Sequence, residues 1–63
     1  MKFVMFMDGE TGIRWKLLGP DDQLMAISTE VFSTVQECFA VVTEIRNNCK
    51  SSKVEDKTAV HAQ

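Results

Sequence analysis

The sequence predicts an α+β domain: a three-stranded antiparallel β-meander followed by one helix packed on one face, a β-β-β-α arrangement. Three observations indicate it. Two glycine-containing turns separate three short apolar segments, residues 13–18 alternate between apolar and polar side chains, and a capping sequence precedes an apolar stripe with helical spacing. The 63 residues fit one small domain. We assign residues 1–54 to it and residues 55–63 to a flexible C-terminal tail.

The first two predicted strands run from Lys2 to Asp8 and from Ile13 to Leu18. The first is apolar on both faces, whereas the second places Arg14 and Lys16 opposite its apolar residues. A third strand is predicted from Gln23 to Ser28. Two short turns, residues 8–12 and 19–22, join the strands, so we expect all three to pair antiparallel. Alternation places on the helix-facing side Phe3, Met5, Trp15, Leu17, Leu24 and Ala26.

A helix is predicted to begin near Thr34, which forms a capping box with Glu37. Ser33 with Gln36 matches the same pattern one residue earlier, and we prefer Thr34. The helix is expected to end near Cys49, and Phe39 and Val35 widen its apolar stripe. The stripe itself is formed by Cys38, Val42, Ile45 and Cys49.

Residues 3–56 resemble the YegP-like family, a domain of unknown function. The resemblance is carried by an ordered set of short motifs: Phe3 to Asp8, then Arg14-Trp15-Lys16-Leu17, then Ala26, Ser28, Glu30 and Phe32, then Cys38, Val42 and Ile45, and finally Val54-Glu55-Asp56. The turn at residues 19–22 departs from the Asn-Gly turn usual in that family. The resemblance implies a β-β-β-α unit that assembles as a two-fold dimer, in some members by exchanging an element. It implies no catalytic residue.

Composition argues against several functions. The net charge of −2 and the scattered lysines and arginines make nucleic acid an unfavourable partner. No apolar run approaches the length of a membrane span or a signal peptide, so we expect a cytoplasmic protein without membrane contact.

Cys38 and Cys49 lie 11 residues apart on one predicted helix, about 16 Å along its axis, which excludes a disulfide between them. Both are expected to be buried thiols.

No catalytic, cofactor-binding or metal site is predicted, and we expect no enzyme activity. Asp8, Glu10, Asp21 and Asp22 fall in the two turns, where carboxylates favour turn formation. His61, the single histidine, lies in the predicted tail without a catalytic or ligating partner. Trp15 is expected under the helix rather than on a base-stacking surface.

One helix cannot cover both faces of this sheet. The far face is therefore expected to expose an apolar patch, which on a small domain usually marks an interface. The candidate interface consists of Val4, Phe6, Leu18, Met25 and Ile27. We therefore expect a homodimeric structural or interaction module that buries this face or exchanges a strand, with an unidentified protein as a further partner. Strand curvature together with the C-terminal tail is the other way in which this face could be covered. The alternative is a nucleic-acid- or ligand-binding adaptor that uses the open sheet face.

Overall fold

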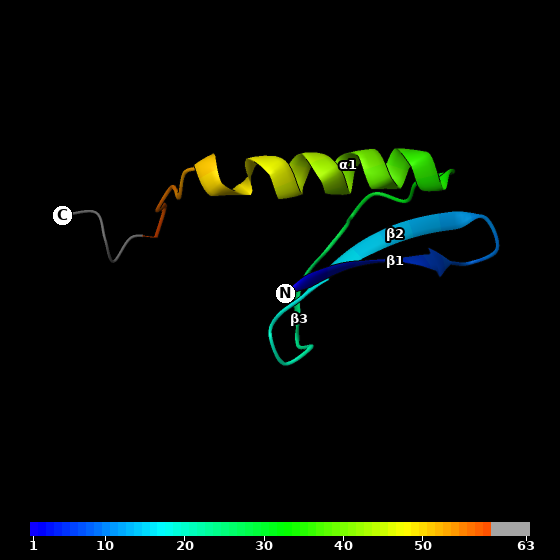
Figure 1. Cartoon of the computed structure of the whole chain (residues 1–63), viewed down its shortest axis with the longest axis horizontal. Coiled ribbons are helices and arrows are strands. Elements are labelled where there is room, and N and C mark those ends of the chain that lie inside the picture. Colours follow the sequence, from blue (N-terminus) through cyan, green and yellow to red (C-terminus); the bar gives the residue numbers. More distant parts are fainter. Residues whose placement is uncertain (59–63) are drawn as a thin grey trace.

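A computed structural model of the chain describes residues 1–58. Within that range it confirms the predicted fold, an antiparallel sheet of three strands in the order β1-β2-β3 followed by one α-helix. The strands are β1 (Lys2–Asp8), β2 (Gly12–Leu18) and β3 (Leu24–Ile27), and the helix is α1 (Val35–Asn48). Figure 1 shows α1 lying along one side of the β1–β2 hairpin, with its C-terminal end reaching past the start of β1.

The β1–β2 hairpin is regular along its whole length. Its register runs from Lys2 opposite Leu18 to Asp8 opposite Gly12 without interruption. Gly9 turns the chain with a φ of +82°, a conformation that glycine adopts at no steric cost. This hairpin forms the regular part of the sheet along which the helix lies.

The third strand departs from the predicted pattern. It covers four residues, and a bulge shifts the register so that Leu24, and not Met25, lies opposite Leu18. The strict alternation expected from Gln23 to Ser28 is therefore interrupted. The link after Ser28, expected to be irregular, instead makes a second contact with β2, because Phe32 and Ile13 exchange two backbone hydrogen bonds of 2.8 Å.

The helix begins where the capping sequence predicts. Thr34 is extended and its Oγ1 accepts a hydrogen bond from the backbone N–H of Glu37 at 3.1 Å. The Glu37 carboxylate accepts hydrogen bonds from the hydroxyls of Ser33 and Thr34, at 2.9 and 3.0 Å. The first turn is thus stabilised by side chains on both sides of the cap.

A small core joins the helix to the sheet. Among the described residues its buried apolar members are Ile13, Phe32, Cys38 and Val42. Phe3 and Trp15 pack against this core. Their two rings contact each other edge to face, with their centroids 5.7 Å apart. The prediction that Trp15 lies under the helix is confirmed.

The end of the helix corrects one expectation. Cys38 is buried as predicted, but Cys49 is exposed, because α1 ends at Asn48 and Cys49 starts a short 3-10 helix, η1 (Cys49–Ser51). At this end α1 extends past the start of β1 (Figure 1). Val54, the last residue of the predicted domain, is 96% exposed. Of the predicted tail, residues 59–63 and with them His61 lie outside the described residues.

Candidate functional site

The outer edge of β1 presents backbone groups that the sheet does not use. Ile13 exchanges hydrogen bonds with Phe32, and the N–H of Ser28 donates to the Trp15 carbonyl at 2.9 Å. Ile13 and Trp15 thus direct their backbone groups away from β1. The alternate residues Arg14 and Lys16 direct theirs towards β1, where they pair with Phe6 and Val4. Backbone groups point outward at the alternate positions Phe3, Met5 and Met7.

The two edges of the sheet differ in how they are protected. The edge strand β3 is four residues long and bulged, two features that discourage pairing with another chain. The edge strand β1 has seven residues in regular register, and from Phe3 to Met7 it is wholly apolar. Its charges stand only at its ends, on Lys2 and Asp8. By these criteria β1 is the edge more open to a partner strand.

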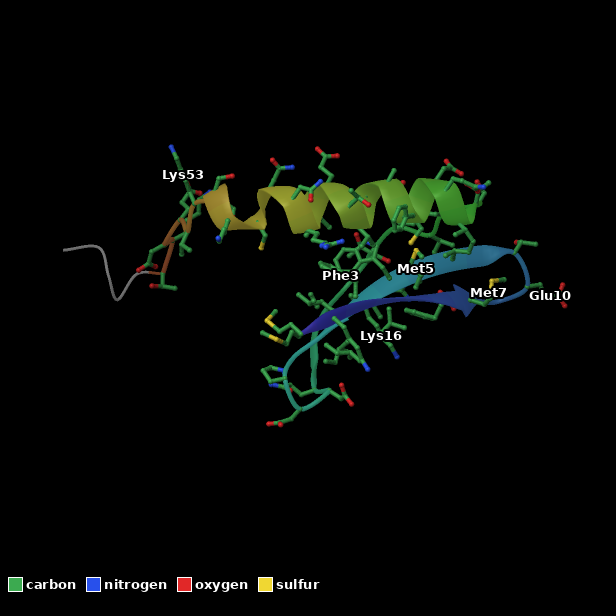
Figure 2. All side chains as sticks on the ribbon, viewed as in Figure 1. Phe3, Met5, Met7, Glu10, Lys16 and Lys53 are labelled. Carbon is green, nitrogen blue, oxygen red and sulfur yellow. The ribbon has the colours of Figure 1, made fainter. Side chains whose placement is uncertain are left out.

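A groove that is mostly apolar, with two cationic side chains in its lining, runs between β1 and the helix. It has a volume of about 610 Å³ and is lined by Met1, Lys2, Phe3, Met5, Leu17, Phe39, Val42, Arg46 and Cys49. Figure 2 shows Phe3 and Met5 between the sheet and the helix, and Lys16 on the opposite side. Phe39, expected to widen the buried stripe, is instead 56% exposed, and Val35 and Met7 are similarly open. Val35 lies one helical turn before Phe39 on the same side of α1. We call Met5, Met7, Val35 and Phe39 the β1-edge strip.

The predicted interface on the far face of the sheet is distributed unevenly. Val4, Phe6 and Leu18 are half-buried, whereas Met25 and Ile27, on the short edge strand β3, are exposed. The Nζ of Lys16 lies 5.3 Å from the centre of the Phe6 ring, so a cation lies over the main aromatic group of this face.

Arg14, which also lies on the far face, has a structural role that the sequence did not indicate. Its guanidinium donates two hydrogen bonds to the carbonyl of Ser28 and pairs with Asp8 at 3.3 Å. The buried Ser28 hydroxyl accepts from the Trp15 N–H at 3.2 Å and donates to the Glu30 carbonyl at 3.0 Å. This network fixes the link that leads from β3 to Phe32.

Two of the four carboxylates predicted to favour turns pair with cationic side chains. Asp8 pairs with Arg14, and Asp22 lies 3.6 Å from the Nζ of Lys2. Asp22 has a φ of +62° and its N–H donates to the Gly19 carbonyl, which fits the predicted role of this segment as a turn. In residues 1–58, no group of three or more histidine, cysteine, aspartate or glutamate side chains is arranged to hold a metal.

Among residues 1–58, two side chains have a pKa that departs clearly from its ordinary value. Burial raises the pKa of the Cys38 thiol, which stays protonated in the core. The pKa of Asp56 is lowered because the hydroxyl and the N–H of Thr58 both donate hydrogen bonds to its carboxylate, at 2.7 and 2.9 Å.

None of the helices found in the described part of the chain is long and apolar enough to cross a membrane. The chain was also compared with protein-family models, with curated proteins and with solved structures, and none of them matched.

Proposed function

We propose that this chain is a small cytoplasmic structural or interaction module, without catalytic activity of its own, whose working form is a homodimer. The observation that carries the proposal is the β1-edge strip, where Met5, Met7, Val35 and Phe39 are exposed beside an unprotected strand edge. Apolar surface gathered beside open backbone groups favours association with another polypeptide.

Surface area supports the same proposal. The chain has an accessible surface of 5350 Å², roughly 1,300 Å² above that of a compact monomer of the same mass. A standard protein interface buries about 800 Å² on each partner. Part of the difference belongs to the exposed segment that follows Ser51. The difference is thus an upper limit on the excess surface of the folded part, and it exceeds the area that a standard interface buries on each partner.

The adaptor that binds nucleic acid or a ligand through the open sheet face ranks second. Base stacking needs an accessible aromatic ring, and the ring of Phe6 already carries the Lys16 ammonium. The net charge of −2 further opposes phosphate binding.

Sedimentation equilibrium tests the homodimer. From low micromolar to near-millimolar concentration, the weight-average mass is expected to rise from 7.1 kDa towards twice that value. A mass of 7.1 kDa at every concentration would overturn the proposal. Retention of the chain on a nucleic-acid column that is lost with added salt would favour the adaptor instead.

A further inference from the structure

We infer that two copies join through their β1 strands, antiparallel and with Met5 opposite Met5 of the second copy, to form one continuous sheet. This inference rests on the proposed homodimer and specifies its surface and register. The partner is a second copy of this chain because the β1 edge is complementary to itself in three respects: backbone groups, charge and apolar side chains.

The backbone groups favour this register. Phe3, Met5 and Met7 direct their N–H and C=O groups outward. With Met5 opposite its counterpart, Phe3 of each copy lies opposite Met7 of the other. All three outward-facing positions then form hydrogen-bonded pairs, whereas a shift by two residues leaves one of them unpaired.

The charges at the ends of β1 agree with the same register. Lys2 and Asp8 are its charged residues, and they stand at equal distances from Met5 along the strand. Antiparallel pairing about Met5 therefore brings Lys2 of each copy opposite Asp8 of the other. A parallel arrangement would instead place like charges side by side, which is unfavourable.

The apolar side chains complete the match. A two-fold axis perpendicular to the sheet leaves both helices on the same side, because Phe3, Met5 and Met7 of each copy share that side. These residues then form a continuous apolar surface between the two helices. The 610 Å³ groove and the exposed Phe39 ring border that surface in each copy, so the β1-edge strip becomes buried.

Disulfide trapping tests the register in a Cys49→Ser background, where the remaining Cys38 is buried. The Met5→Cys variant is expected to form a covalent dimer in a glutathione redox buffer, because paired Cα atoms lie about 5.5 Å apart, within reach of a disulfide. The Met7→Cys variant is the matched control. Its two cysteines would be offset by about 13 Å along the strands and should remain reduced.

The control is a strict one because Met7 is more exposed than Met5, 59% against 38%. Random collisions would therefore crosslink the Met7→Cys variant at least as fast. Equal trapping of both variants, or trapping of the Met7→Cys variant alone, would overturn the inferred register. Far-ultraviolet circular dichroism confirms that each variant is folded.

Charge exchange gives a second, independent measurement. The Lys2→Glu variant is expected to raise the dimer dissociation constant by about tenfold, since two cross-copy pairs become repulsive, and adding Asp8→Lys should restore most of the affinity. If neither charge substitution changes the dimer dissociation constant and Ile27→Lys dissociates the dimer, the interface lies on the far face of the sheet. That result overturns this inference but leaves the homodimer standing, whereas a strict monomer refutes both.

Discussion

Replacing Ser28 with alanine tests the network that positions the link to the helix. The hydroxyl of this buried residue accepts from the Trp15 N–H and donates to the Glu30 carbonyl. Its removal leaves a donor and an acceptor unpaired in a partly buried place, at a cost of about 1–3 kcal/mol for each fully buried group. We expect a total loss of about 2 kcal/mol, which in a domain of this size lowers the melting temperature by about 10 °C.

The assay is thermal unfolding followed by circular dichroism at one fixed protein concentration, because dimerisation makes the melting temperature depend on concentration. The neighbouring Thr29 is exposed and serves as the matched control, with Thr29→Ala expected to change stability by less than about 0.5 kcal/mol. If Ser28→Ala melts within a degree or two of Thr29→Ala, the Ser28 network does not stabilise the fold and the reasoning is refuted.

Three further predictions concern the helix and the core. The Thr34→Ala variant loses about 1 kcal/mol of unfolding free energy by urea titration, and Ser33→Ala, which leaves the cap itself intact, loses less. The Phe32→Ala variant loses about 3–5 kcal/mol, comparable with the whole stability of so small a domain, and its circular dichroism should be that of an unfolded chain. Cys49 reacts at once with a thiol reagent, whereas Cys38 reacts only on unfolding. Because its pKa is raised in the folded state, Cys38 favours folding at lower pH, and this contribution declines as pH rises above about 8.5. Equal thiol reactivity, or a flat pH profile, would contradict this assignment.

The elements set by local sequence were predictable. Alternation identified β2, and the capping box identified Thr34 as the start of the helix, because both signals depend on residues only a few positions apart. The end of the helix was less well predicted, since Cys49 continues the apolar stripe and yet lies beyond the last turn of α1. Helical spacing alone does not show where the sheet beneath a helix ends.

Features that depend on distant contacts were not predictable. A bulge places Leu24 opposite Leu18, and Phe32 pairs with Ile13. Both features depend on how β2 pairs with residues further along the chain. The hydrogen bonds of Arg14 to the Ser28 carbonyl likewise join residues 14 positions apart. None of these has a local sequence signature.

The candidate interaction surface shows the same limit. The sequence correctly indicated more apolar side chains than one helix can cover, and it directed attention to the far face of the sheet. Strand order shows that β1 is also an edge, and the path of the helix leaves Met7 and Phe39 exposed beside it. A pattern of alternating residues distinguishes faces but carries no information about edges.

Amide hydrogen exchange measured residue by residue tests the pairing of β1 most directly. At high protein concentration, the account predicts protection of the Phe3, Met5 and Met7 amides, and loss of that protection on dilution. The amides of Val4 and Phe6, which serve the β1–β2 hairpin, should remain protected at both concentrations. Rapid exchange of the Met5 amide at every concentration, with Val4 and Phe6 still protected, would contradict the claim that a second copy pairs with this edge.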